Sequence, residues 1–315
     1  MAEKTIFSTI KRRIDKLIYR FKNFGFLVPF FDYLYEITQS KLINIIKHKI
    51  IANYLKTKYA AFVSERRNNT NIPPQGDIPK QIWISWWNGI DMMPPLVSAC
   101  YQSTLRYSNG YKVNLVTKYN YKDYITIPDC IIKKIENESL SLTHFSEIIR
   151  TALLYNHGGL WLDATWLITS PIEIQDLPFF TIRTFYNSPR NIANGRWQCN
   201  IIGSVQKYHL FGFLFDFLVN YWSSHKYLLT YHLFDYAINL AYESFPSVKK
   251  SFDIIKPMNK NDFIVNNLKN GFDLPSYENA VKDTIFHKLS YKRVGSDTLP
   301  GNKLTYYGYI LNMYL

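Results

Sequence analysis

The feature that most constrains this 315-residue chain is a helical pattern that stops at two glycines and continues at once as a strand pattern. Apolar residues recur at helical spacing from Phe145 to Leu153. Gly158 and Gly159 then supply the left-handed conformation in which helices commonly end. Residues 160–168 (LWLDATWLI) read as a strand. The pattern predicts a helix that turns sharply into a rigid strand.

Short oxygen ligands gather on one face of that strand. Side chains alternate with a period of two, so Trp161, Asp163 and Thr165 point to the same side. The side-chain oxygens of Asp163 and Thr165 suit Mg²⁺ or Mn²⁺. These hard ions take few carboxylates, and phosphate oxygens and water complete their octahedral shell. The alternative is that Asp163 merely closes a buried strand. The spacing alone leaves both interpretations open.

Four segments resemble one family, the capsular polysaccharide synthesis glycosyltransferases, which are related to the DXD-type sugar transferases of GT-A fold. They are residues 78–89 (IPKQIWISWWNG), 94–103 (PPLVSACYQS), 144–172 and 287–292 (HKLSYK). The third segment is the specific one, because it holds a serine-acid pair, an arginine three residues after the acid, the double glycine and Asp-Ala-Thr. The resemblance implies a metal-dependent hexosyltransferase with a GT-A-like nucleotide-diphospho-sugar transferase domain.

The resemblance assigns roles to the helix and the strand. Glu147 and Arg150 match an acid and an arginine that hold the donor sugar and its phosphates, although the family commonly has aspartate at the first position. The alternative for these two is a surface ion pair three residues apart on a helix, worth a few tenths of a kcal/mol. Asp163, Thr165 and the late His287 are expected to hold Mn²⁺ or Mg²⁺.

Further donor contacts are implied outside that segment. Trp86 or Trp87 is expected to stack on the nucleobase, and Asn200 stands where the family has a polar residue near the sugar. Lys288 and Lys292 are expected to hold the charge of the departing phosphate. For the tryptophans, packing against the sheet is the alternative.

A candidate for the acceptor side is Asp235, which falls on a helical pattern at 231–243 and resembles an acidic position of the family. An inverting transferase needs a general base near the acceptor hydroxyl, and a carboxylate can serve. The alternative is a buried aspartate that caps a neighbouring element. Relatives mainly retain the anomeric configuration, so the resemblance implies retention. Residues 183–199 are polar and are expected to form a lid or a surface loop.

The first 70 residues differ from the rest in charge. They carry 14 Lys or Arg against 5 Asp or Glu, whereas the net charge of the whole chain is +13. Basic and apolar residues alternate at helical spacing over residues 4–22, as in helices that lie on anionic lipid. Packing of that apolar stripe on the rest of the protein is equally compatible. We expect a helical N-terminal extension over 1–70 and a catalytic domain over 71–315, joined by the turn-rich residues 68–77.

The second part reads as an α/β domain with a largely parallel sheet. Strand patterns at 81–87 and 111–117 flank a helical pattern that follows Pro94 and Pro95, and this alternation is typical of such sheets. Ligands of open α/β sheets collect at the carboxyl ends of the strands, where Trp87 and Asp163 are both expected.

Composition narrows the setting. Three cysteines without C-x-x-C spacing are too few for a disulfide framework. No signal peptide and no run of about 20 apolar residues is visible. We therefore expect a cytoplasmic protein, soluble or peripheral on the inner face of the membrane.

These patterns converge on one hypothesis. The protein would transfer a hexose from a nucleotide-diphosphate sugar, UDP-hexose, to a glycan or lipid-linked oligosaccharide of a growing capsular or other surface polysaccharide. A non-catalytic membrane-associated scaffold is the alternative, but it leaves the Asp163 strand unexplained. Nucleic-acid binding would explain only the charge, since no helix-turn-helix, zinc-finger or RNA-binding signature accompanies it.

Overall fold

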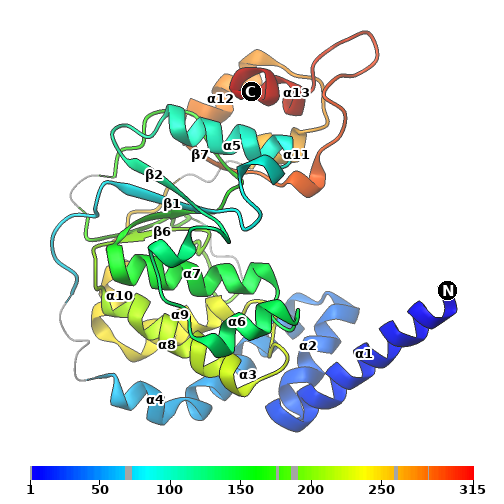
Figure 1. The fold of residues 1–315 in the computed structure, drawn as a ribbon, viewed down its shortest axis with the longest axis vertical. Helices are drawn as coiled ribbons and strands as arrows, with labels where there is room; N and C mark the ends of the chain where they lie inside the picture. The colour runs from blue at the N-terminus through cyan, green and yellow to red at the C-terminus, as the bar shows by residue number, and fades with distance from the viewer. Residues whose placement is uncertain (1, 68–72, 175–176, 186–190, 259–261, 283) are drawn as a thin grey trace.

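The computed structural model describes residues 2–67, 73–174, 177–185, 191–258, 262–282 and 284–315, with side chains from residue 11 onward. A β-sheet lies in the middle of the molecule with helices on both of its sides (Figure 1). The N-terminal helices extend the layer on one side, and the C-terminal helices belong to the layer on the other. The expected α/β class is therefore confirmed.

The central sheet has five strands in the order β2, β1, β3, β6 and β5. Their bounds are β1 Gln81–Ser85, β2 Lys112–Val116, β3 Gly159–Leu162, β5 Phe179–Thr181 and β6 Ile201–Ser204. The strands β2, β1 and β3 pair in parallel, and β6 is antiparallel to both β3 and β5. Four strands thus share one direction, which confirms the mostly parallel sheet. The GT-A fold in particular stays a prediction.

Alternation along the strands divides the core into two layers. Leu160 and Leu162 of β3 face a cluster that includes Val97, whereas Trp161 between them faces a cluster that includes Phe145. The helices around the sheet are α5 (Pro95–Arg106), α6 (Asp129–Glu136), α7 (Leu142–His157), α8 (His209–Ser224), α9 (Leu233–Ser244), α10 (Pro246–Asp253), α11 (Phe263–Asn267), α12 (Leu274–Lys282) and α13 (Tyr306–Tyr314). Short 3-10 helices occur at η2 (Ile90–Met92), η3 (Tyr121–Asp123) and η4 (Tyr291–Arg293).

The strand expected over residues 160–168 is two strands, and the single-strand prediction is wrong. β3 ends at Leu162, while β4 (Trp166–Ile168) pairs antiparallel with β7 (Phe286–Lys288) in a separate two-stranded sheet. The chain changes partners at Asp163, because β3 pairs with β1 and β6 and β4 pairs only with a segment from the far end of the sequence. Asp163 and Thr165 therefore belong to the turn that connects the two sheets.

The N-terminal segment is helical, as expected. Its helices are α1 (Ala2–Phe24), α2 (Leu27–Thr38), α3 (Lys41–Lys58) and α4 (Ala60–Glu65). Gly25, with φ of 71°, separates α1 from α2, and the Ser40 hydroxyl caps α3 by accepting a hydrogen bond from the Ile43 N–H. Both breaks fall at positions where the local sequence favours a helix end.

These helices share their core with the rest of the protein. Phe24 is buried, and its ring stacks on Tyr221 of α8 at a centroid distance of 6.4 Å. Arg20 binds the Asp32 carboxylate and also donates to the Leu229 carbonyl. The predicted boundary near residue 70 falls beside residues 68–72, which lie outside the described part of the chain, so the division into 1–70 and 71–315 stays a prediction.

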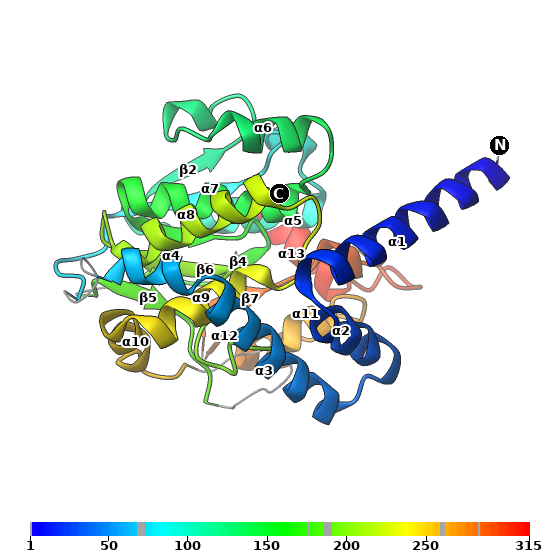
Figure 2. The same ribbon diagram turned by 90° about the horizontal axis from the view of Figure 1, so that it is seen from below.

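The beginning of α1 extends away from the body of the protein (Figures 1 and 2). Ile14, Leu17 and Ile18 are exposed, whereas Phe24 at the end of α1 is buried. Among the described residues, no helix combines the length and apolarity needed to cross a bilayer.

Candidate functional site

A cavity of about 630 Å³ opens beside the carboxyl end of β3. Its size lies within the range of small-molecule sites. The lining comes from α7, the turn after β3, residues 191–200 and the start of α9. Its members include Glu147, Arg150, Asp163, Asn200 and Asp235, all of which the sequence had singled out. The fold thus assembles five predicted residues from distant segments around one space.

Helix α7 presents the acid and the arginine. The Ser141 hydroxyl caps its start by accepting from the His144 N–H, and Gly158, with φ of 65°, ends it. Glu147 lies one turn into the helix, and its Oε2 is 3.2 Å from His144 Nδ1. Burial raises the pKa of Glu147 above its ordinary value, although His144 and Arg150 oppose that shift. A carboxyl group of raised pKa in a cavity is typical of functional sites.

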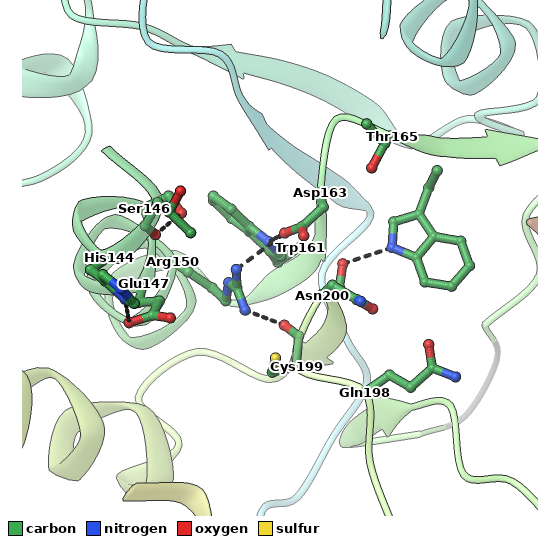
Figure 3. A network of polar contacts seen from close by, with 12 residues as sticks. His144, Ser146, Glu147, Arg150, Trp161, Asp163, Thr165, Gln198, Cys199 and Asn200 are labelled. Carbon is green, nitrogen blue, oxygen red and sulfur yellow. Dashed lines mark hydrogen bonds and ion pairs between the residues drawn. The ribbon is translucent and has the colours of Figure 1, made fainter. Parts of the chain in front are cut away.

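Arg150 connects three parts of the site (Figure 3). Its Nη2 donates to Asp163 Oδ1 at 3.1 Å, and its Nη1 donates to the Cys199 carbonyl. The guanidinium also lies over the Trp161 ring at 4.9 Å. Its side chain is only 5% exposed. The alternative of a surface ion pair on α7 is therefore wrong for Arg150.

Asp163 receives hydrogen bonds from three side chains. Besides Arg150, Trp161 Nε1 donates to Oδ1 at 2.9 Å and Lys288 Nζ donates to Oδ2 at 3.1 Å. Burial alone would raise the pKa of Asp163, but Lys288 and Arg150 outweigh it and hold that pKa below its usual value. The Asp163 N–H donates to the Asn200 carbonyl at 2.9 Å, which fixes the turn. The site therefore holds an ionised carboxylate between two cations.

The residues expected to bind a divalent metal are not brought together as a metal site. Thr165 Oγ1 accepts from Lys288 Nζ at 2.7 Å, so the ammonium group lies against both Thr165 and Asp163. His287 is buried, hydrogen bonds with Thr284 O, and alternates with Lys288 to the opposite face of β7. In the described residues, no group of three His, Cys, Asp or Glu could hold a metal. As arranged, these donors do not fit a bound Mn²⁺ or Mg²⁺, and the metal stays a prediction from the sequence.

Asp235 lies on the side of the cavity formed by α9. Its Oδ1 accepts from Trp197 Nε1 at 3.0 Å, and His232 Nδ1 is 3.7 Å from Oδ2. The side chain is held by these contacts and still lines the cavity. The general-base role expected for an inverting reaction stays a prediction.

Three other predicted donor residues lie elsewhere. Trp86 Nε1 donates to the Met92 carbonyl, and Trp87 packs edge-on against Phe145 of α7 at a centroid distance of 5.0 Å. Both rings are partly exposed, and Lys292 is exposed in η4. In the part of the chain that the structure describes, none of the three lines the cavity with Glu147.

Several contributors were not found from the sequence. His144 contacts Glu147 from three residues earlier on α7, a spacing at which helix side chains meet. Trp161 was placed on the same strand face as Asp163, but its hydrogen bond was not foreseen. Trp197 and Cys199 belong to the segment expected as a lid or surface loop, whose residues 186–190 lie outside the described part of the chain; no local pattern marks their contacts with Asp235 and Arg150.

Comparison with known proteins gives a family for this chain. No curated protein matches the chain. A similar solved structure is the PaToxG glycosyltransferase, at 11% identity, which covers 66% of this chain and 83% of that one with a TM-score of 0.41. The model of the family described as capsular polysaccharide synthesis protein matches residues 32–310. The resemblance seen in the sequence is thereby confirmed, and the chain belongs to the capsular polysaccharide synthesis protein family.

Proposed function

We propose that this protein transfers a hexose from a nucleotide-diphosphate sugar, UDP-hexose, to a hydroxyl of a growing capsular or other cell-surface polysaccharide. One observation carries the proposal. Arg150 and Asp163 line the cavity at the end of β3 together with Glu147, one turn from Arg150 on α7. Lys288, which is not among the lining residues, donates to Asp163 at 3.1 Å. The cations are suited to bind a diphosphate, and the neighbouring carboxyl group is suited to bind the hydroxyls of a sugar. Membership of the capsule synthesis family supports it.

The chemistry assigns different work to each group. The bond between the anomeric carbon and the β-phosphate oxygen breaks with its electron pair on that oxygen, and Arg150 stabilises the charge that develops there. Glu147 accepts hydrogen bonds from sugar hydroxyls and orients the ring. Asn200 supplies further polar contacts. Trp86 or Trp87 stacks on the base.

The reaction proceeds with retention of the anomeric configuration, on the ground of the family resemblance. In that case Asp235 orients the acceptor and no base abstracts the proton from the opposite side. An NMR spectrum of the product decides, because an inverted anomeric signal would assign Asp235 the role of general base instead.

The first experiment is incubation of the purified protein with a panel of nucleotide sugars, recording which is hydrolysed to free sugar and nucleotide. Hydrolysis of one UDP-sugar that falls at least 100-fold in Glu147→Ala supports the function. A non-catalytic scaffold predicts no hydrolysis of any donor, and that result would remove the enzymatic proposal. The exposed Glu138→Ala is the matched control, because this residue lies in the turn just before α7.

A second cavity supports a place for the acceptor. It measures about 670 Å³ between α3 and α9 and shares Asn191 with the first cavity. Lys49, Lys56 and Arg196 line it against the single carboxylate of Glu243. A glycan that carries acidic groups fits such a lining. Lys56→Glu should raise the KM for the acceptor more than the KM for the donor, and equal changes would contradict this location.

Membrane contact through α1 completes the proposal, with the protein on the cytoplasmic face of the membrane. Ile14, Leu17 and Ile18 share one helix face and are exposed, among exposed basic residues at 11–13 and 16. Vesicles containing anionic lipid should sediment the protein, and Ile14→Ser with Leu17→Ser and Ile18→Ser should abolish this. The control is Ile254→Ser, since that residue is similarly exposed far from α1 in the sequence. Sedimentation unchanged by the triple substitution would contradict the role of α1.

A further inference from the structure

One cation position lies between the two residues that the sequence assigns to a metal. Lys288 Nζ is 3.1 Å from Asp163 Oδ2 and 2.7 Å from Thr165 Oγ1. The carboxylate and the hydroxyl therefore converge on a single positive group. This positive group is the ammonium of Lys288 on β7, which is far from Thr165 in the sequence.

The backbone fixes Lys288 at this position. In the pairing of β4 with β7, Lys288 stands directly opposite Trp166, the residue that follows Thr165. The N–H of Leu289 also donates to the Thr165 carbonyl at 2.9 Å. The turn after β3 is thus hydrogen-bonded to the end of β7. The strand pairing and the Leu289 hydrogen bond together hold Lys288 beside Asp163.

We propose that the Lys288 ammonium takes the place of a divalent metal in this protein, so that Lys288 and Arg150 together bind the donor diphosphate and transfer needs no metal ion. This inference rests on the proposed function. Asp163 holds the two cations in position rather than holding a metal. A lysine suits this task, because its ammonium group is a compact point charge that binds phosphate through rotatable donors.

The surrounding charges favour the lysine over a dication. A metal ion would have to displace Lys288 from both oxygens while remaining beside the guanidinium of Arg150, which is only 5% exposed. The histidine expected to complete the metal shell, His287, is on the other face of β7 and hydrogen bonds with Thr284 O. A single carboxylate that already neutralises one of two cations is a poor ligand set for a hard dication.

The transfer step balances without a metal. The bond from the anomeric carbon to the β-phosphate oxygen breaks, and its electron pair stays on that oxygen beside Lys288 and Arg150. The acceptor hydroxyl oxygen forms the new bond to the anomeric carbon, and its proton passes to the departing phosphate oxygen. The two cations stabilise the leaving diphosphate electrostatically.

The test measures UDP binding by calorimetry and UDP-sugar turnover in the full chain, first in EDTA and then in Mn²⁺. We expect both quantities to agree within about twofold between the two conditions. Lys288→Met should weaken UDP binding on the order of tenfold, as expected for a charge-assisted phosphate contact. The exposed Lys282→Met on α12 is the matched control and should bind UDP as the wild type does.

A second readout uses Mn²⁺ alone and follows the loss of its free signal by electron paramagnetic resonance, with and without UDP. Because UDP itself binds Mn²⁺, the signal is compared with that of UDP alone. The wild type should take up no further Mn²⁺, and neither should Lys288→Met, since Asp163 beside Arg150 remains a poor ligand set for a dication. Binding and turnover that vanish in EDTA and return with Mn²⁺ would overturn the inference and leave the proposed function intact. Failure of the wild type to bind any nucleotide diphosphate in either condition would overturn both.

Discussion

The carboxylate of Asp163 should be a stabilising group as well as a functional one, and Asp163→Asn tests this. The amide keeps the size of the side chain but removes the charge that faces Arg150 and Lys288. The exposed fractions of the three side chains are 31% for Asp163, 5% for Arg150 and 25% for Lys288. The ion pair between Asp163 and Arg150 therefore resembles a buried ion pair, whereas the ion pair between Asp163 and Lys288 is partly screened by water.

The magnitude follows from that difference in burial. Breaking a buried ion pair costs about 3–5 kcal/mol, whereas an exposed pair contributes only about 0–1 kcal/mol. Because Asp163 itself is nearly a third exposed, we take the lower end for Arg150 and a small term for Lys288, which gives about 3 kcal/mol. At roughly 2 °C per kcal/mol for a chain of this size, Tm should fall by about 6 °C.

The assay is thermal and denaturant unfolding of the wild type, the two single variants and the double variant of a double-mutant cycle. Asp163→Asn and Lys288→Met should be non-additive, with a coupling of about 1 kcal/mol, because removal of one charge relieves the other. Asp216→Asn is the control, since Asp216 pairs with Arg66 at 3.1 Å but is half exposed; it should change stability by less than about 0.5 kcal/mol. If Asp163→Asn unfolds like Asp216→Asn, Asp163 does not neutralise two cations.

Three further predictions follow from the site and its scaffold. Because burial raises the pKa of Glu147, ionisation of this carboxyl lowers the stability of the folded protein at neutral pH. Glu147→Gln should therefore raise Tm at pH 7, and the gain should disappear as the pH falls and the wild-type carboxyl becomes protonated in the folded and the unfolded protein. An equal difference in Tm between variant and wild type at pH 7 and at pH 4 would contradict this. Gly159→Ala places a Cβ 2.7 Å from the Gln81 carbonyl oxygen at φ of 97°, so it should destabilise the protein by clearly more than Gly76→Ala, which has a similar φ and open space; denaturant midpoints of the two would compare them. Trp197→Phe removes the donor to Asp235 and should raise the acceptor KM in steady-state kinetics, and an unchanged value would separate Asp235 from the acceptor.

Much of the fold follows from local patterns in the sequence. The helix that ends at Gly158, the strands at 81–85 and 112–116 and the helix with Asp235 all form where periodicity and turn residues indicate them. These features are local, because a helix face or a strand face is set by residues within a few positions. Glu147 and Arg150 lie on one helix that the pattern predicts, but their roles came from the family resemblance.

The parts that were not foreseen depend on strand partners. Alternation over residues 160–168 is compatible with one strand or two, and only the pairing of β4 with β7 decides where the first one ends. The same pairing aims Lys288 at Asp163 and turns His287 to the other face, so the sequence identified both residues but could not assign their directions. Contacts of Trp197 and Cys199 depend on how residues 191–200 fold over the cavity, and no periodic pattern encodes that path.

The shared core of the N-terminal helices sets where the chain can be shortened for recombinant production. A version that starts after residue 66 would leave the Tyr221 side of α8 in water, because Phe24 and Tyr59 normally shield it, and we expect such a product to accumulate in inclusion bodies. A version that starts at residue 19 would retain Tyr19, Arg20 and Phe24 and discard only the projecting turns. The second version should be the better one for crystallisation trials, because it lacks the part of α1 that projects from the body of the protein.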